Sequence, residues 1–134
     1  MAKAGVELRD LTKEFTDPAG KKIVAVDDVS FVVEPGEMVT LLGPSGCGKT
    51  TILRMIGGFE LQTKGEIYID GRPMGLLPPN RRNTSMVFQS YALFPHLTIF
   101  NNIAYGPRVK KMPRAEVDRK VREIMSVVGL GGME

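Results

Sequence analysis

Gly43-Pro44-Ser45-Gly46-Cys47-Gly48-Lys49-Thr50 has the spacing of a phosphate-binding loop: a glycine, any four residues, then Gly-Lys-Ser/Thr. Glycines let the backbone wrap an anion closely, and the loop N–H groups and the dipole of a following helix favour negative charge. In such a loop Lys49 can reach the β- and γ-phosphates, and the Thr50 hydroxyl can ligate Mg²⁺. The stretch therefore predicts a nucleoside triphosphate site. The alternative is a glycine-rich turn between a strand and a helix.

The segments on either side favour the phosphate site. Residues 38–42 (Met-Val-Thr-Leu-Leu) are typical of a buried strand that enters such a loop. Residues 50–56 are typical of the helix that leaves it, and the glycine pair 57–58 predicts the end of that helix.

The residues before the loop predict a small antiparallel β-layer. Residues 6–11 alternate apolar and polar, as a half-buried strand does, and residues 23–26 and 29–33 predict two further strands. Residues 34–37 (Glu-Pro-Gly-Glu) favour a type II turn, with proline early and glycine next. The phosphate loop follows this layer directly.

Two more strands are predicted after the loop. Residues 65–71 form a strand that ends in an Asp70-Gly71 turn. Residues 84–88 (Thr-Ser-Met-Val-Phe) form a short apolar strand, which we expect to lie parallel to residues 38–42. Between them, three prolines make residues 72–80 a loop.

Two helices are predicted in the last third of the chain. Thr98 is a suitable N-cap for a helix over residues 99–105, which Pro107 ends. A final helix begins near Pro113, and Gly129 suits the position after its end. Its apolar face is predicted to be Val117, Val121, Ile124, Met125 and Val128.

The composition is that of a soluble globular protein of one modest domain. The chain has 134 residues, of which 43% are hydrophobic and 25% charged. The net charge of +3 is spread along the chain among acidic residues, so we expect no nucleic-acid partner. A single Cys excludes an internal disulfide, and no apolar run approaches the length of a membrane span.

Several stretches together resemble the nucleotide-binding subunits of ATP-binding cassette (ABC) transporters, most closely the bacterial importers for polyamines, ferric iron and sugars. They are the loop with Thr51 behind it, residues 87–98 (Val-Phe-Gln-Ser-Tyr-Ala-Leu-Phe-Pro-His-Leu-Thr), and residues 11–15 and 26–31 upstream. The resemblance covers nearly the whole chain.

The resemblance implies an α/β fold of the P-loop NTPase, ABC type. Residues 1–37 would form the antiparallel β-layer, and residues 38–89 an incomplete RecA-like core from the phosphate loop through Gln89. Residues 90–134 would begin a helical subdomain. Together they would form a partial ABC nucleotide-binding domain.

Roles for single residues are also implied by the resemblance. Phe15 would stack on adenine; the alternative is an ordinary buried aromatic. The loop would clamp the phosphates of ATP, with Thr50 on Mg²⁺ and Thr51 at the α-phosphate. Gln89 would contact Mg²⁺ or the attacking water. The resemblance implies that Lys49 and Gln89 are the catalytic residues. The implied nucleotide-binding set is Phe15, Gly43, Pro44, Ser45, Gly46, Cys47, Gly48, Lys49, Thr50, Thr51 and Gln89.

The resemblance implies partners as well. The stretch from Ser90 to Thr98 would pack against a membrane-embedded permease subunit, and a second copy of the chain would close around two nucleotides. A periplasmic or lipid-anchored solute-binding protein would act indirectly, and the chain would be cytoplasmic and peripheral on the inner face of the cell membrane. Within this stretch an apolar patch would make the contact, or else its side chains fill the local core: Tyr91, Leu93, Phe94 and Leu97.

Other motifs of the family find only partial matches. Residues 67–70 (Ile-Tyr-Ile-Asp) resemble a Walker B strand, but Gly71 stands where the catalytic Glu belongs. Residues 130–134 (Leu-Gly-Gly-Met-Glu) resemble the Leu-Ser-Gly-Gly-Gln signature only superficially, and the position of His96 is not that of the switch histidine. The chain is therefore interpreted as the N-terminal part of a longer cassette. We expect the 134-residue chain alone to hydrolyse ATP only at the background rate.

The favoured function is an energy-coupling ATPase subunit of an importer, which hydrolyses Mg-ATP by in-line attack of water. The alternatives are a non-transport ABC ATPase, a binding-only nucleotide module, and a small-molecule kinase or GTPase. No heptad run follows Gln89 as in DNA-repair relatives, and the guanine-binding Asn-Lys-x-Asp of GTPases is absent from the sequence. A kinase would lack the set at residues 89–98. The sequence does not specify the transported solute.

Overall fold

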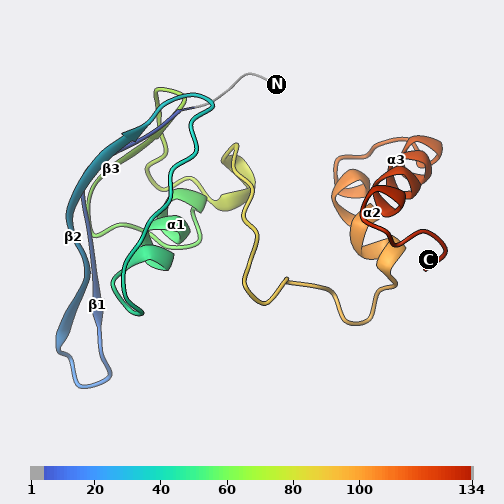
Figure 1. Cartoon of the computed structure of the whole chain (residues 1–134). Coiled ribbons are helices and arrows are strands. Elements are labelled where there is room, and N and C mark those ends of the chain that lie inside the picture. The colour runs from blue at the N-terminus through green and yellow to red at the C-terminus, as the bar shows by residue number, and fades with distance from the viewer. Residues whose placement is uncertain (1–4, 134) are drawn as a thin grey trace. The chain divides into compact units, whose positions relative to one another are not determined.

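The computed structural model describes residues 5–133 (Figure 1). The chain divides into two compact units, with the boundary between Met86 and Val87. The first unit holds a β-sheet and the helix α1 (Lys49–Gly57), and the second holds α2 (Ile99–Val109) and α3 (Arg114–Val127). In the described part of the chain, none of the helices combines the length and apolar character needed to cross a membrane.

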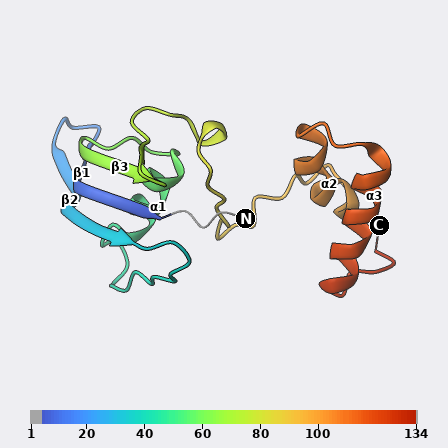
Figure 2. The same cartoon turned by 90° about the horizontal axis from the view of Figure 1, so that it is seen from above.

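The sheet of the first unit has four antiparallel strands in the order β2-β1-β3-β4. β1 (Val6–Thr16) lies between β2 (Lys22–Val33) and β3 (Lys64–Ile69), and the short strand β4 (Arg72–Pro73) forms an edge. Figures 1 and 2 show the three long strands side by side, with α1 on one side of the sheet. The predicted antiparallel layer is confirmed, and it also includes the strand that follows α1.

Two tight turns close the hairpins of this sheet. Asp17 accepts hydrogen bonds from the backbone N–H groups of Ala19 and Lys21 (2.9 and 2.8 Å), which fixes the β1–β2 hairpin. Asp70 and Gly71 join β3 to β4 with φ of 54° and 70°. Positive φ at both central residues is the type I′ geometry that the Asp-Gly pair favours. Asp70 is thus a turn residue, as predicted.

β2 is one continuous strand, whereas the apolar runs at residues 23–26 and 29–33 predict two. Between the runs, Asp28 has a φ of 49° and its N–H donates to the Thr12 hydroxyl at 3.1 Å. The β1–β2 register shifts at this point, because two residues of β2, Asp27 and Asp28, lie opposite Thr12 of β1. The polar residues therefore mark a bulge, which bends a strand without ending it.

The core of the first unit lies between the sheet and α1. Leu8 and Leu11 of β1, Ile67 of β3 and Met55 of α1 are fully buried in one cluster. Gly58 follows α1 with a φ of 77°, and its N–H donates to the carbonyl of Met55 at 3.1 Å. The helix therefore ends at the glycine pair, as predicted.

The predicted strands at residues 38–42 and 84–88 are wrong: both segments are irregular. The type II turn before the first of them is present, since Gly36 has a φ of 87° and Glu37 N–H donates to the Glu34 carbonyl at 3.0 Å. An inner strand of a parallel sheet is held by backbone hydrogen bonds from both neighbours. Within residues 5–133, neither segment lies in the sheet.

In the second unit, α2 begins at the predicted cap. The Thr98 hydroxyl accepts a hydrogen bond from the N–H of Asn101 at 3.2 Å. This satisfies one of the N–H groups that a helix start leaves without a partner, and it fixes the first residue of the helix.

The prediction that Pro107 ends this helix is wrong, because α2 continues to Val109 with Pro107 inside it. Proline cannot donate the hydrogen bond to the residue four before it, but its own carbonyl still accepts. The N–H of Lys110 bonds to Gly106 and that of Met112 to Pro107, both at 3.1 Å. The helix therefore loses one bond near its end and completes the turn.

α3 packs on α2 through a face narrower than the predicted stripe. Ala104 of α2 is buried against this face, whereas Ile124 and Val128 are exposed. Glu116 and Lys120, four positions apart in α3, form an ion pair at 3.1 Å. The buried positions of α3 are spaced four residues apart: Val117, Val121 and Met125.

Candidate functional site

The phosphate-loop sequence forms a loop that leads directly into α1. Residues 45–48 form turns, and Gly48 is the N-cap of α1. Among residues 5–133, no side chain caps this helix start, and its first turn carries no acidic residue. The first backbone N–H groups of α1, with the positive end of the helix dipole, are therefore left for an anion.

Gly48 is the position where conformation and packing both require a glycine. Its φ is 92°, in the left-handed region. A Cβ at this position would lie 2.4 Å from the carbonyl oxygen of Ala25 and 3.2 Å from Cγ2 of Val26, both on β2. A backbone oxygen cannot turn aside, so the loop is held tightly against β2 and the sheet fixes the place of the anion site.

The Lys49 side chain lies across the loop that precedes it. Its Nζ donates to the carbonyls of Gly43 and Pro44, both at 2.7 Å, and lies 3.4 Å from Sγ of Cys47. All three acceptors belong to the loop itself. The loop thus holds a full positive charge beside the N-terminus of α1. A phosphate group at this place would be attracted both to the Lys49 ammonium and to the N–H groups of the helix start.

The first turn of α1 presents two hydroxyl groups. Thr50 is exposed and Thr51 is half-buried. In phosphate sites Mg²⁺ is held by one or two protein oxygens together with phosphate oxygens and water. An exposed hydroxyl at the loop therefore fits Mg²⁺ that arrives with a nucleotide. In the part of the chain that the structure describes, no group of three or more His, Cys, Asp or Glu side chains could hold a metal ion.

Phe15 lies near the loop, on β1. It pairs across the ladder with Ile23 of β2, two residues from Ala25, which the loop contacts through Gly48. Two residues of a strand span about 7 Å. Phe15 is 39% exposed, and Nζ of Lys13 lies 4.7 Å from the centroid of its ring. The structure therefore places Phe15 on the β1–β2 hairpin, close to the point where the phosphate loop contacts that hairpin.

Gln89 lies in the second unit, at the start of an exposed turn. The turn is closed by a hydrogen bond from the N–H of Tyr91 to the carbonyl of Phe88 at 2.9 Å. Tyr91 and Ala92 have φ of 61° and 50°. The role of Gln89 at the phosphates stays a prediction from the sequence.

The apolar patch predicted after Gln89 is divided by the structure. Tyr91 is 79% exposed and Leu93 is 68% exposed. The ring of Phe94 instead packs on that of Tyr105 in α2, with 4.7 Å between centroids, and Leu97 is half-buried. The first two side chains are thus available to a partner, and the last two stabilise the unit.

Asn102, which the sequence does not single out, holds this segment in place. Its Oδ1 accepts from the N–H of Phe94 at 2.9 Å. Its Nδ2 donates to three carbonyls at 3.1–3.2 Å: those of Phe94, Leu97 and Thr98. One side-chain amide therefore fixes the loop before α2. An asparagine in the first turn of a helix is common, so no pattern marks this role.

Arg82 is a second residue that the sequence does not indicate. Its side chain is buried, and burial lowers the pKa of its guanidinium. The guanidinium bonds to backbone carbonyls at 2.8–3.2 Å: those of Met55, Ile56, Gly75 and Leu77. Two of these lie at the C-terminal end of α1, where the helix dipole favours a cation. Arg82 therefore ties the chain after η1 (Pro79–Arg81) to the phosphate-loop helix.

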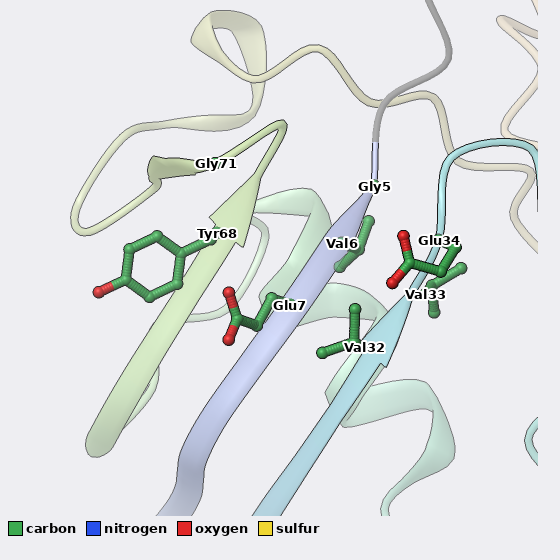
Figure 3. A pocket seen from close by; sticks show the side chains of 8 residues that line it. All are labelled: Gly5, Val6, Glu7, Val32, Val33, Glu34, Tyr68 and Gly71. Atoms are coloured by element: carbon green, nitrogen blue, oxygen red, sulfur yellow. The ribbon is translucent and has the colours of Figure 1, made fainter.

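A separate small pocket of about 140 Å³ lies over the ends of β1, β2 and β3 (Figure 3). Its polar wall includes Glu7, which forms an ion pair with Arg9 at 2.7 Å. The Arg9 guanidinium holds the pKa of the Glu7 carboxyl below its usual range, and it also lies over the ring of Tyr68 at 4.5 Å. Since the protein satisfies this carboxylate itself, we assign no ligand to the pocket.

Comparison with known proteins gives consistent matches. The profile of the family described as ABC transporter matches residues 26–134. The spermidine/putrescine import ATP-binding protein PotA of Acidothermus cellulolyticus is 52% identical over 130 residues, which are 97% of this chain and 34% of that protein.

Two solved structures of the ATP-binding cassette MJ0796, each 31% identical, share the fold. One is a dimeric post-hydrolysis state bound to ADP and Pi, with a TM-score of 0.79 over 90% of this chain and 56% of that chain. The other, a dimeric structure of the bacterial ABC transporter cassette, has a TM-score of 0.75 over 85% and 53%. The predicted fold class is thereby confirmed, and the chain spans about a third of the curated relative's length.

Proposed function

The chain belongs to the ABC transporter family, and from that premise we propose that it binds Mg-ATP as part of the energy-coupling subunit of a membrane importer. The observation that carries the proposal is the phosphate loop, in which the Lys49 ammonium lies beside an uncapped helix start. A triphosphate would satisfy both the ammonium and the free N–H groups of α1.

We propose that the complete cassette hydrolyses Mg-ATP by in-line attack of water. The loop N–H groups and Lys49 would balance the charge on the phosphates, and Thr50 with Gln89 would ligate Mg²⁺. Gln89 would also orient the water, and Phe15 would stack on adenine. In phosphoryl transfer, positioning and charge stabilisation provide most of the catalysis, which is the chemistry that these residue types supply.

The affinity of the 134-residue chain for Mg-ATP tests the site. We expect Lys49→Ala to weaken binding roughly 10- to 100-fold, because it removes a charge-assisted contact to phosphate. Lys21→Ala removes an exposed lysine of the β1–β2 hairpin and should leave the dissociation constant unchanged. Equal affinities of the wild type and Lys49→Ala in isothermal titration would rule out nucleotide binding at this loop.

The exposed side chains after Gln89 support a permease partner. We propose that Tyr91 and Leu93 contact a membrane-embedded subunit, and that a second copy of the cassette completes the site. The protein would then be peripheral on the cytoplasmic side of the membrane. Serine at both positions in the complete cassette should reduce its co-purification with the permease, and undiminished recovery would argue against docking here.

The solute class is proposed from the similarity to PotA, which is named for spermidine and putrescine import. We infer that the importer takes up a cationic polyamine. In proteoliposomes that contain the complete importer, polyamine with its binding protein should stimulate ATP hydrolysis more than a sugar or ferric iron does. Stimulation by another solute class alone would exclude this assignment.

A further inference from the structure

The Lys13 side chain of β1 has three partners in the first unit, of which two lie in the segment after α1 and one on β1 itself. Its Nζ forms an ion pair with Oε1 of Glu60 at 2.7 Å and donates to the carbonyl of Leu61 at 2.8 Å. The same ammonium lies 4.7 Å from the centroid of the Phe15 ring. The Lys13 side chain is only 13% exposed. A lysine held by three partners has lost the freedom that surface lysines usually keep.

The partners of Lys13 lie where the chain leaves the phosphate-loop helix. The N–H groups of Phe59 and Glu60 donate to the carbonyl of Arg54 in α1. A few residues later Thr63 is fixed to β1: its N–H bonds to the carbonyl of Thr12 at 2.8 Å, and its hydroxyl accepts from the N–H of Glu14 at 2.9 Å. The ion pair between Lys13 and Glu60 therefore belongs to the segment of residues 59–63 that links α1 to β1.

The position of the ammonium decides which part of the Phe15 ring a ligand can use. A cation over an aromatic face is attracted to the ring electrons. Lys13 occupies one face, and a phenyl ring has two, so a stacked base must use the other. Phe15 keeps enough exposed surface for such a contact. The Lys13 ammonium contacts the face of the Phe15 ring that a base would not use, so the orientation of the ring is set before a ligand binds.

We propose that Lys13, anchored by Glu60, is a positioning residue that orients the Phe15 ring for stacking with a nucleotide base. The inference rests on the proposed function, in which Phe15 contacts adenine. Pre-ordering a side chain reduces the entropy that binding costs. Lys13 touches no phosphate in this scheme, so its effect is confined to the base.

The test compares two ligands of the full 134-residue chain, Mg-ATP and magnesium tripolyphosphate, which lacks the base. Lys13→Met keeps the aliphatic stem and removes the charge, and it should weaken Mg-ATP about 2- to 5-fold while tripolyphosphate is unchanged. Phe15→Ala should weaken Mg-ATP alone, by about 5- to 150-fold. Lys13→Arg should restore the affinity, since a guanidinium also binds an aromatic face.

Lys22→Met is the matched control. Lys22 pairs with Glu14 at 2.9 Å on the same hairpin, so this variant removes one ion pair and one positive charge without touching Phe15. We expect it to bind both ligands as the wild type does. Glu60→Gln keeps the Lys13 charge and loosens its anchor, so it should lower the ratio of ATP to tripolyphosphate affinity by a smaller factor, even if Lys13→Met folds poorly.

The outcomes separate the inference from the proposed function. An unchanged affinity ratio in Lys13→Met and Glu60→Gln, with a lowered ratio in Phe15→Ala, would overturn the role of Lys13 and leave base stacking intact. Equal weakening of both ligands in Lys13→Met would mean that Lys13 only supports the fold. If Phe15→Ala binds ATP normally, base stacking itself is refuted.

Discussion

Cys47, the single cysteine of the chain, is exposed within the phosphate loop, and its Sγ lies 3.4 Å from Nζ of Lys49. A nucleotide at the loop would cover the thiol, so we expect saturating Mg-ATP to slow its alkylation by iodoacetamide. Thiol reactivity depends on access. In Lys49→Ala the protection should require a higher ATP concentration. Alkylation at one rate with and without Mg-ATP, followed by mass spectrometry, would contradict a site at this loop.

Arg82 is a buried cation whose partners are all backbone carbonyls. We expect Arg82→Met to lower the free energy of unfolding of the first unit by about 3 kcal/mol, since it leaves several buried acceptors without a donor. Arg81→Met, at the exposed neighbouring position, should change it by less than about 0.5 kcal/mol. Urea denaturation measures both. A similar small loss in the two variants would show that the carbonyls find other partners.

Glu14 gives the hairpin a pH dependence with a defined sign. The hydrogen bond from the Lys22 ammonium lowers the pKa of the Glu14 carboxyl below its ordinary value of 4.5. A lowered folded-state pKa stabilises the protein above the unfolded-state pKa, and this contribution is lost as the pH falls through the folded-state value. Lys22→Met should therefore raise the pKa of Glu14 in an NMR titration. An unchanged titration midpoint would show that the ion pair is not populated in solution.

At the level of elements, the features that the sequence predicted correctly are mostly local. The cap at Thr98, the glycine end of α1 and the Asp70-Gly71 turn each depend on residues a few positions apart. The phosphate loop belongs with them, because its geometry depends on glycines within eight residues. Local chemistry is enough to predict such features.

The expected strands at residues 38–42 and 84–88 failed because strands depend on distant partners. An apolar run indicates burial, but the hydrogen bonds of a strand come from neighbours that the run does not name. The same limit hid two contacts between residues far apart in sequence. Lys13 and Glu60 are 47 positions apart, and Arg82 is 26 and 27 positions from the carbonyls of α1 that it contacts. Side chains with non-local partners carry no pattern of their own.

The packing at the end of α1 can be tested by substituting Gly58, the glycine that follows the helix. Gly58 and Gly71 have similar φ, 77° and 70°, but a Cβ at Gly58 would lie 2.6 Å from Nε of Arg82, whereas no atom of residues 5–133 beyond its chain neighbours would lie within 4 Å of a Cβ at Gly71. Gly71→Ala should cost about 1–2 kcal/mol of unfolding free energy from backbone strain alone. Gly58→Ala should cost about 1–3 kcal/mol more, because Arg82 is held by four carbonyls and cannot move freely. Equal costs in thermal or urea unfolding would mean that Arg82 shifts without loss.

At the scale of the whole molecule, the two units have separate apolar cores, one between the sheet and α1 and one between α2 and α3. Of the residues assigned to the nucleotide, all but Gln89 lie in the first unit, and those assigned to the permease lie in the second. The proposed contacts of the phosphate loop and of Phe15 therefore belong to the unit with one core, and the proposed permease contacts belong to the unit with the other.

The irregular segment before the phosphate loop leaves large apolar side chains in water. Met38 is 93% exposed and Leu42 is 89% exposed, and neighbouring exposed apolar residues mark interaction or aggregation surfaces. We expect the 134-residue chain to self-associate, with a weight-average mass in light scattering that rises with protein concentration. Lysine at both positions should reduce this rise by charge repulsion and lost burial, whereas Val109→Lys, at an exposed position of α2, should not. A wild-type chain that stays monomeric at high concentration would contradict the expectation. It would show that the exposed apolar side chains do not drive self-association.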